Sequence, residues 1–345
     1  MNNGESYMKA YRIYSGKKQD ALELIEHPVA NPTAREIRVR VRAVSLNYRD
    51  LMIAWGQYPI ASDPPPIAVA DGAGEVIAVG PQVTRFKVGD HVAIPYYPDW
   101  IDGEPTPESV HRVPGATIDG MLAEEIVVPE DVLISVPSRL EFTEAATLPC
   151  AGVTAWNALF VGGAVKPGNT VLLLGTGGVS IWALQLAKAA GLRTIITSSR
   201  DEKLERARSL GADHTINYRR NPEWQQEVWR ITGGRGVDVV VEVGGDGTLG
   251  RSVASIRPGG TVAIVGGVGG WATEIEIQPV LMRATRLMGI FVGSRAMFED
   301  LNRFVTAAKI RPTIDRVFSF DQAREAHAYL ESANHFGKVV IKVGD

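Results

Sequence analysis

The sequence predicts an α/β protein with two domains, a doubly wound parallel sheet and a β-rich domain. Three observations support this prediction. A chain of 345 residues is long for a single hydrophobic core. From Gly152 onward, apolar strand-like runs alternate with helical patterns, as in a parallel sheet that has helices on both faces. Before about residue 150, short β-branched runs are instead separated by turns of Gly, Pro and Asp.

The first part of the chain is expected to form the β-rich domain. Residues 1–7 are polar, and we expect them to form a loose tail. The clearest strand-like runs are Ile37 to Val44, Ile67 to Val79, His91 to Ile94 and Ala123 to Val128. The segment from Pro95 to Ile118 is rich in proline and acidic residues and has no periodicity, so a long loop or lobe is expected there.

The second part is expected to form the parallel sheet. Six strands are predicted, at residues 171–174, 194–198, 214–216, 237–243, 261–265 and 287–292. Helices are predicted at about 179–190, 202–210, 221–232, 247–256 and 278–285. After Gly293, helical patterns at about 297–308 and 321–332 precede a final strand, Lys338 to Val343. This tail has no place in a finished six-stranded sheet, so we expect it to return to the first domain.

The first strand of this sheet leads into a glycine turn and a helix, and a second strand ends at Ser198. That order is typical of a βαβ unit that binds a dinucleotide, because glycine lets the backbone turn sharply and approach a pyrophosphate. The helix then directs its free N–H groups at the anion. Ser180 stands where the fingerprint has its third glycine, and its small side chain still permits close packing. The residues expected at the pyrophosphate are Gly175, Gly177, Gly178 and Val179.

The end of the second strand indicates which dinucleotide binds. NAD-binding proteins usually place an acid there for the ribose 2′-hydroxyl, and that carboxylate would repel a 2′-phosphate. This chain instead has Ser198, Ser199 and Arg200, with Lys203 one turn further on. Hydroxyls and cations suit a phosphate, so the sequence predicts NADP(H). The alternative is a solvated loop start, since acidic residues at 201, 202 and 205 share this charged run.

Composition excludes several classes of function. A net charge of −3 and the lack of a basic cluster argue against a nucleic-acid partner. No apolar run approaches the ~20 residues of a membrane span, and the N-terminus lacks signal-peptide features, so a cytoplasmic location is expected. Cys150 is the single cysteine, which excludes internal disulfides and fits a reducing compartment.

The order of these segments resembles the medium-chain dehydrogenase/reductase superfamily over Met8 to Val343. The matching runs are RAVSLNYRDLM (42–52), DGAGEVIAVG (71–80), FKVGDHV (86–92), AATLPCAGVTAW (145–156), GADHTINY (211–218), GRGVDVVVEVGG (234–245) and GKVVIKV (337–343). The resemblance implies a GroES-like catalytic domain formed by residues 1–151 and 292–345. It also implies a Rossmann nucleotide-binding domain, residues 152–291, with the active site in the cleft between the two.

The same resemblance identifies the positions where zinc enzymes of the superfamily hold their metal. Asn47 stands at a cysteine position, Ala70 at a histidine position, and Cys150 at the third ligand position. Because a catalytic Zn²⁺ needs about three protein ligands, we predict no metal here. The lobe at about 95–118 contains His111 and no cysteine, so structural zinc is not expected either. Cys150 is expected to pack as a small apolar residue, with a reactive thiol as the alternative.

Without zinc, the resemblance narrows to the quinone-oxidoreductase-like and enoyl-reductase-like branches. It implies catalytic roles for Asn47, which would hold polar groups of the cofactor and acceptor, and for Tyr58 and Thr154 near the substrate carbonyl and the nicotinamide. A phenol suits the donor role because it can both bind a carbonyl oxygen and deliver a proton. The alternatives are a turn residue for Asn47, a loop aromatic for Tyr58 and a helix N-cap for Thr154.

Other residues have structural or cofactor-binding roles in this prediction. Arg49 and Asp50 are expected to form a structural ion pair at a helix start. Tyr218 matches a position that stacks near the adenosine phosphate. Three glycines follow strands four, five and six, where the carboxyl edge of the sheet faces the ligand, although ordinary turns are equally consistent with them. They are Gly244, Gly266 and Gly293.

The sequence thus predicts a zinc-independent oxidoreductase that transfers hydride from NADPH to a quinone or an α,β-unsaturated carbonyl. A simple alcohol or carbonyl dehydrogenase is the alternative enzyme, and a non-catalytic NADPH-binding sensor or structural protein is the alternative class. The run Arg286 to Gly293 is expected to be an apolar edge strand. By resemblance, two subunits would join there into a homodimer, or a tetramer of such dimers.

Overall fold

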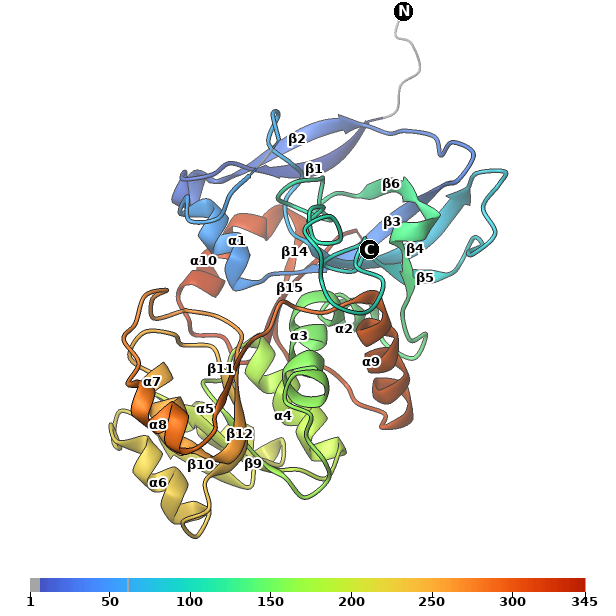
Figure 1. Cartoon of the computed structure of the whole chain (residues 1–345). Coiled ribbons are helices and arrows are strands. Elements are labelled where there is room, and N and C mark those ends of the chain that lie inside the picture. The colour runs from blue at the N-terminus through green and yellow to red at the C-terminus, as the bar shows by residue number, and fades with distance from the viewer. Residues whose placement is uncertain (1–6, 61, 345) are drawn as a thin grey trace, which may run out of the picture. The chain divides into compact units, whose positions relative to one another are not determined.

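The computed structural model describes residues 7–60 and 62–344, and its elements are shown in Figure 1. The predicted N-terminal tail lies outside these residues except for Tyr7. The chain forms two compact units. Unit 1 contains the described residues up to Cys150, then Gly293–Ala307 and the residues from Thr313 onward. Unit 2 contains Ala151–Val292 and Ala308–Pro312.

Unit 2 is built on a six-stranded parallel sheet, as predicted. Its strand order is β10-β9-β8-β11-β12-β13, which is that of a Rossmann fold, and the order reverses between β8 and β11. Ligands of such sheets bind beyond the carboxyl ends of the strands at this reversal. The strands are β8 (Thr170–Leu173), β9 (Arg193–Ser198), β10 (His214–Asn217), β11 (Val237–Glu242), β12 (Ile256–Ile264) and β13 (Arg286–Gly289).

Helices cover both faces of this sheet, because its central strands are apolar on both sides. α3 packs on α4, and α6 packs on α7. α6 and α7 pack on the sheet over a core that includes Leu172, Ile195 and Val240. The helices are α3 (Val153–Trp156), α4 (Gly178–Ala189), α5 (Asp201–Ser209), α6 (Trp224–Ile231), α7 (Leu249–Ser255) and α8 (Ile277–Met282). Single π-helical turns at Leu148–Gly152 and Asn157–Val161 extend α3 at both ends.

Unit 1 contains a mostly antiparallel sheet of seven strands and a separate two-stranded hairpin. The sheet order is β14-β15-β3-β4-β5-β7, with β6 also pairing with β3. The hairpin is formed by β1 (Tyr7–Ile13) and β2 (Leu22–Pro28). The other strands are β3 (Glu36–Ser45), β4 (Asp71–Val79), β5 (His91–Ala93), β6 (Glu125–Pro129), β7 (Ile134–Ser135), β14 (Ile314–Ser319) and β15 (Lys338–Lys342).

Apart from Ala308–Pro312, the C-terminal tail belongs to unit 1, as expected from the sequence. β15 pairs antiparallel with β3, where Val340 faces Ser45, and β14 adds a parallel strand beside it. β14 was not predicted, because the run IDRVFS places polar residues among its apolar ones. In the part of the chain that the structure describes, residues 95–118 form no helix or strand, which confirms the predicted loop. The helices of unit 1 are α1 (Tyr48–Ala54), α2 (Phe142–Ala145), α9 (Arg295–Ala307) and α10 (Ala323–Glu331).

None of the helices in the described ranges is long and apolar enough to cross a lipid bilayer.

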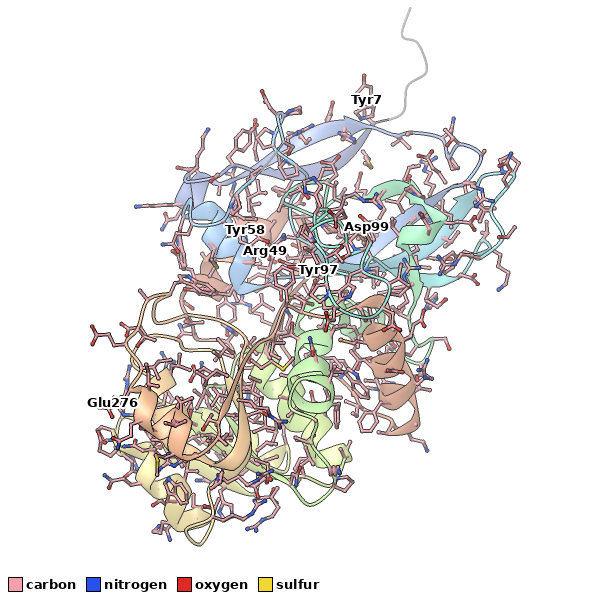
Figure 2. All side chains as sticks on the ribbon, in the orientation of Figure 1. Tyr7, Arg49, Tyr58, Tyr97, Asp99 and Glu276 are labelled. Atoms are coloured by element: carbon pink, nitrogen blue, oxygen red, sulfur yellow. The ribbon has the colours of Figure 1, made fainter. Side chains whose placement is uncertain are left out.

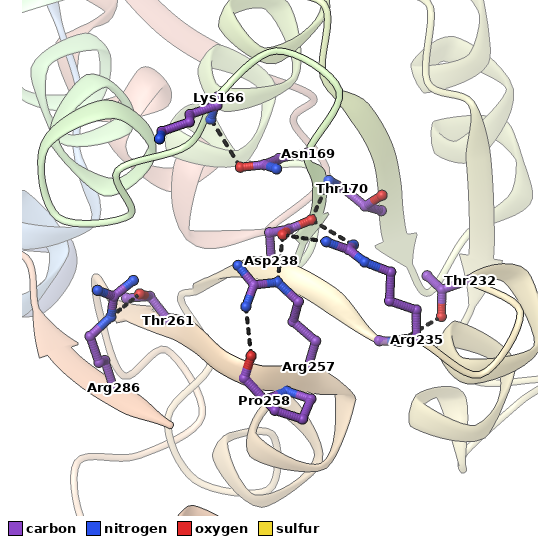
Figure 3. Close-up of polar contacts among 11 residues, drawn as sticks. Lys166, Asn169, Thr170, Thr232, Arg235, Asp238, Arg257, Pro258, Thr261 and Arg286 are labelled. Carbon is purple, nitrogen blue, oxygen red and sulfur yellow. Dashed lines mark hydrogen bonds and ion pairs between the residues drawn. The ribbon is translucent and has the colours of Figure 1, made fainter. Parts of the chain in front are cut away.

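A buried carboxylate stabilises the amino-terminal edge of the parallel sheet in unit 2 (Figure 3). Asp238 on β11 accepts hydrogen bonds from the guanidinium of Arg235 (2.8 Å), from Arg257 Nε (2.6 Å) and from the Thr170 backbone N–H (2.8 Å). Its side chain is only 2% exposed. Burial alone would raise the pKa of this carboxyl, but the hydrogen bonds outweigh it and lower the pKa from 3.8 to about 2.

Replacing Asp238 by asparagine should lower the free energy of unfolding by about 2 kcal/mol near neutral pH, because charge-assisted hydrogen bonds are lost. A lowered folded-state pKa stabilises the protein above the unfolded value of 3.8, and this contribution disappears as the pH falls toward 2. The urea midpoints of the parent and Asp238→Asn should therefore begin to approach each other below about pH 5 and converge only near pH 2. Glu227→Gln, which breaks an exposed pair with Arg230, is the control and should cost less than about 1 kcal/mol. Equal costs for the two variants would contradict this account.

Candidate functional site

Asn47 lies at the junction of β3 and α1 in unit 1, where it is the N-cap of the helix. Its backbone N–H donates to Asp50 Oδ2 (2.8 Å), so the carboxylate satisfies one of the free donors at the helix start. The predicted ion pair is confirmed, because Arg49 Nη2 donates to Asp50 Oδ1 at 3.0 Å. The backbone of Asn47 therefore acts as a turn residue. Its side chain is hydrogen-bonded to a residue of β15.

The carboxamide of Asn47 is held by a buried lysine. Lys338 is the first residue of β15, and its Nζ donates to Asn47 Oδ1 at 2.6 Å and to the Leu46 carbonyl oxygen at 2.7 Å. Lys338 is 3% exposed and Asn47 is 9% exposed. Asn47 Nδ2 is buried and has no hydrogen-bond partner among the described residues. The NH2 group of a fixed amide, with two N–H donors, is therefore available.

Two further polar groups lie beside this lysine. Burial raises the pKa of Asp71 to about 6, even though the Lys338 charge and the nearby Asn47 amide lower it. Asp71 Oδ2 accepts from the Cys150 backbone N–H (3.2 Å), whereas Oδ1 lacks a partner within the described ranges. Burial and the Asp71 charge raise the pKa of the Cys150 thiol to about 12. The thiol therefore stays protonated near neutral pH, which disfavours the reactive-thiol alternative.

Tyr58 belongs to an aromatic group that surrounds Arg49. The guanidinium lies 5.7 Å from the centre of the Tyr58 ring and 5.4 Å from that of Tyr96, within the range of a cation–π interaction. The two phenol oxygens are 3.5 Å apart. Arg49 Nη1 also donates to the Pro114 carbonyl oxygen at 2.9 Å, so the cation is fixed on several sides. Figure 2 shows Arg49, Tyr58 and Tyr97 close together in unit 1.

Thr154 lies in unit 2, inside the helical run that contains α3. It is buried, and residues on both sides of it are helical. Because an N-cap residue has non-helical backbone angles, the N-cap alternative for Thr154 is wrong. Its hydroxyl stays a candidate for contact with the nicotinamide.

The predicted glycine turn follows β8 and leads into α4. Gly175 has φ +72°, a conformation that residues with a Cβ rarely adopt, and its N–H donates to Thr197 Oγ1 on β9 (3.2 Å). α4 begins at Gly178, after Gly177. The Ser180 hydroxyl donates to the Leu174 carbonyl oxygen at 2.6 Å, so serine at the third glycine position is packed and satisfied. The turn therefore has the strand, glycine and helix order of a dinucleotide site.

The polar residues after β9 lie beside the end of β10. Ser198 faces Asn217 in the parallel register, and its carbonyl oxygen accepts from the Tyr218 N–H at 3.1 Å. Tyr218 is thus brought next to Ser198, at the end of the strand. Arg200 is exposed at the N-cap of α5, with Ser199 before it and Lys203 in the first turn. Asp201 accepts from Asn217 Nδ2 (2.7 Å) and pairs with Arg220, so its charge is already compensated.

The glycine loops after β11 and β12 are tied together by Glu242. Its carboxylate accepts from the Gly244 N–H (2.6 Å), and its carbonyl oxygen accepts from the Gly266 N–H (3.4 Å). A Cβ at Gly244 would lie 2.4 Å from Thr248 Oγ1, so packing alone requires glycine there. At Gly266 the nearest described atom would be 3.6 Å away, and packing gives no such reason. Gly293 belongs to unit 1 and follows β13 by four residues.

Lys338, Asp71 and Glu242 were not predicted as site residues from the sequence. Lys338 lies in the run GKVVIKV, where a lysine that precedes a buried strand resembles an ordinary surface residue. Asp71 and Glu242 each lie at one end of an apolar strand. A charged residue within a run that is otherwise buried was the available signal.

Comparisons with known proteins agree with this architecture. Residues 33–138 match the family described as alcohol dehydrogenase GroES-like domain, and residues 178–307 match the family described as zinc-binding dehydrogenase. A zinc-type alcohol dehydrogenase-like protein of Schizosaccharomyces pombe is 45% identical over 314 residues, covering 89% of this chain and 91% of the relative. A quinone oxidoreductase of Pseudomonas aeruginosa is 31% identical over 341 residues, covering 96% and 98% respectively.

A solved structure described as an NAD-dependent alcohol dehydrogenase superposes with a TM-score of 0.88 at 34% identity, covering 98% of this chain and 100% of the other. The two matched families together span more than half of the chain, and the relatives cover nearly all of it. The chain therefore belongs to the medium-chain dehydrogenase/reductase superfamily, oxidoreductases that bind a nicotinamide cofactor and act on small molecules.

Proposed function

We propose that this protein is a zinc-independent, NADP(H)-dependent reductase of quinones or α,β-unsaturated carbonyls. The observation that supports it best is the lysine-held Asn47 amide, whose Nδ2 donor has no partner among the described residues. When bound, the nicotinamide cofactor supplies the hydride. The protein must then stabilise the negative charge that develops on the carbonyl oxygen.

The residues at the zinc position do not fit a zinc ion. Ala70 has no donor atom and the Asn47 oxygen is occupied by Lys338, so Cys150 is the single remaining ligand of the three. The Lys338 ammonium group, 2.6 Å from Asn47 Oδ1, would also repel Zn²⁺. Nowhere in residues 7–60 and 62–344 do three or more His, Cys, Asp or Glu side chains gather so that they could hold a metal. We therefore assign charge stabilisation to the protein's own donors.

Purified protein should accordingly contain less than stoichiometric zinc. A chelator should leave both turnover and the thermal unfolding temperature unchanged, because no step and no fold contact depends on a metal. Elemental analysis and activity before and after chelation check this expectation. About one tightly bound zinc per chain, lost together with activity, would refute it.

The proposed preference for NADP(H) over NAD(H) rests on the side chains at the end of β9. The Ser198 and Ser199 hydroxyls and the exposed Arg200 guanidinium offer donors to a 2′-phosphate, with Lys203 one turn on. Asp201, an acid of this run, is engaged by Asn217 and Arg220, which weakens its repulsion of an anion. This arrangement differs from the strand-end acid of an NAD site.

The proposal that a quinone or an α,β-unsaturated carbonyl accepts the hydride rests on the hydrogen-bond donors of unit 1. The Asn47 amide can donate a hydrogen bond to an oxygen that becomes negative after hydride addition, and the Tyr58 phenol can both hydrogen-bond and protonate such an oxygen. Relatives named quinone oxidoreductase (31% identical) and 2-haloacrylate reductase (30% identical, Burkholderia) reduce acceptors of this conjugated kind by name. The alternative, a simple alcohol or carbonyl dehydrogenase, is supported by the names of other relatives.

An acceptor panel distinguishes these functions. NADPH oxidation is measured with a quinone, an enone and a saturated ketone, and NADP⁺ reduction is measured with a primary alcohol. Turnover restricted to the conjugated acceptors supports the proposal. Turnover on the saturated ketone and the alcohol supports a simple dehydrogenase. NADPH binding with no turnover on any acceptor supports a non-catalytic binding protein.

We further propose that unit 2 mediates formation of a homodimer, or a tetramer of dimers. β13 is an edge strand, and the neighbouring α8 has no buried residue although most of its residues are apolar. Ile277, Leu281 and Met282 are each more than 70% exposed. An uncovered apolar edge of this kind requires a partner, and a second copy offers the same edge in complementary orientation.

Sedimentation at low micromolar concentration should therefore show a species of at least twice the 37.3 kDa of one chain. The double variant Leu281→Glu, Met288→Lys should shift it toward the monomer, because charges would be buried at the joined edges. Val88→Glu, at an exposed apolar position of unit 1, is the control and should not dissociate it. A parent protein that sediments only as a monomer would contradict the proposal.

A further inference from the structure

The burial of Lys338 needs an explanation. The side chain is 3% exposed, and the next three residues of β15 are fully buried apolar residues. Taking an ammonium group out of water is costly unless it is paired and hydrogen-bonded, so such lysines are rare. Burial lowers the pKa of Lys338, and the charges of Asp71 and Asp50 offset only part of this effect. The strand pairing of β15 does not require a lysine here.

The contacts of Lys338 fix the orientation of one amide. A lysine ammonium can only donate hydrogen bonds, so the Asn47 atom 2.6 Å away must be the carbonyl oxygen. The Nδ2 group therefore points away from the lysine. A second bond, to the Leu46 carbonyl oxygen at 2.7 Å, anchors the ammonium to the backbone next to Asn47. The amide can then neither flip nor rotate without breaking a buried charge-assisted hydrogen bond.

The other end of the Asn47 side chain is its NH2 group, a hydrogen-bond donor. Asn47 Nδ2 is buried, and no partner for it exists among the residues described. A side-chain hydrogen bond from Asn47 lowers the pKa of the Asp71 carboxyl group, but the contact falls outside strict hydrogen-bond geometry, and Asp71 Oδ1 has no other partner among the described residues. Because Nδ2 carries two N–H donors, at least one of them is left for a ligand. A buried donor without a partner is destabilising, so its presence in a folded protein needs an explanation, and a role in binding or catalysis is one.

We propose that Lys338 is a positioning residue, which holds the Asn47 amide so that its N–H donor meets the carbonyl oxygen of the acceptor. The inference rests on the proposed reductase function. Lys338 itself does not touch the acceptor in this account. It acts through Asn47, and its charge strengthens the donor by polarising the amide.

A double-mutant cycle tests this assignment. Lys338→Met keeps the length of the side chain but removes the charge and the donor, and should lower kcat on an enone by about ten- to a hundredfold. The Kd for NADPH should change less than about threefold. In an Asn47→Ala background the same change should have little further effect, since Lys338 acts through the missing amide. Lys338→Arg should restore part of the loss. Lys342→Met, at the exposed end of the same strand, is the control and should match the parent.

A second variant covers the case in which Lys338→Met does not fold. In Asn47→Asp, a carboxylate oxygen can still accept from Lys338, but the Nδ2 donor is gone. Its kcat should fall as far as that of Asn47→Ala while its unfolding temperature stays near that of the parent. Multiplicative losses in the double mutant, or parental kcat in either Lys338→Met or Asn47→Asp, would overturn the proposal.

A readout without turnover separates this inference from the proposed function. The side-chain amide resonances of Asn47, assigned in ¹⁵N-asparagine-labelled protein by their loss in Asn47→Ala, report the orientation of the group. They should shift and broaden in Lys338→Met and stay near parental positions in Lys342→Met. If the parent reduces no acceptor but the amide is released as expected, the function is wrong and the positioning role holds. Unchanged amide resonances in Lys338→Met would overturn the positioning role, whatever the activity.

Discussion

Replacing Asn47 by alanine should lower turnover on an α,β-unsaturated ketone by about 10² to 10³-fold, the usual cost of losing one donor to a developing oxyanion. Hydride addition to the β-carbon moves negative charge onto the carbonyl oxygen. In the proposed reaction that oxygen meets Asn47 Nδ2, a buried donor on an amide whose own oxygen is held by Lys338. A donor already in place needs no reorganisation during the reaction, which is why its loss is expected to be large. Steady-state kcat with saturating NADPH measures the effect.

Tyr58→Phe gives a graded comparison at the second proposed donor. The phenol lies beside the Arg49 cation and 3.5 Å from the Tyr96 hydroxyl, so it can deliver a proton and regain one. A quinone accepts electrons readily and needs less help from protonation than an enone. The loss of turnover should therefore be larger on the enone, with NADPH affinity little changed. Tyr7→Phe, on an exposed tyrosine of β1, is the control. Parental turnover of both Asn47→Ala and Tyr58→Phe on every acceptor would assign these residues to packing alone.

NADPH should bind at least about tenfold more tightly than NADH, because a 2′-phosphate adds charge-assisted hydrogen bonds of roughly 1.5–3 kcal/mol each. Arg200→Ala should weaken NADPH about ten- to a hundredfold and leave NADH nearly unchanged, because only the phosphate uses the guanidinium. Fluorescence titration of both cofactors against both proteins measures the four dissociation constants.

Arg208→Ala is the matched control for Arg200→Ala. Arg208 lies on the same helix, α5, but donates to Glu205 (2.8 Å) and Thr215 (2.5 Å) rather than lying at the strand end. Its removal should shift both cofactors equally or not at all. Equal constants for NADPH and NADH in the parent, or equal losses in Arg200→Ala, would contradict the assignment of the 2′-phosphate to this loop.

The parallel sheet of unit 2 was predictable because each strand is a short apolar run bounded by turn residues. Strand β13 shows the limit of that rule. The apolar run Arg286 to Gly293 predicted a strand to residue 292, but the strand ends at Gly289, where no neighbouring strand continues the pairing. β14 was missed for the opposite reason, since its exposed polar residues hide an edge strand whose stability comes from pairing with β15.

The candidate site was predictable only in part. Asn47 and Tyr58 lie on one stretch of chain, and the resemblance identified both. Lys338 lies 291 residues after Asn47 in the sequence, and only the pairing of β15 with β3 brings it to the amide. Periodicity along the chain carries no information about such a contact. The same holds for Glu242, whose role depends on the two loops that it joins.

The most direct test of the proposed function is the position of the hydride in the product. An enone is reduced with NADPH that carries deuterium at both C4 positions, and the product is analysed by NMR. The account predicts a saturated ketone with deuterium on the carbon that was β to the carbonyl. Deuterium on the carbinol carbon of an allylic alcohol would contradict it, because that product belongs to a simple carbonyl dehydrogenase.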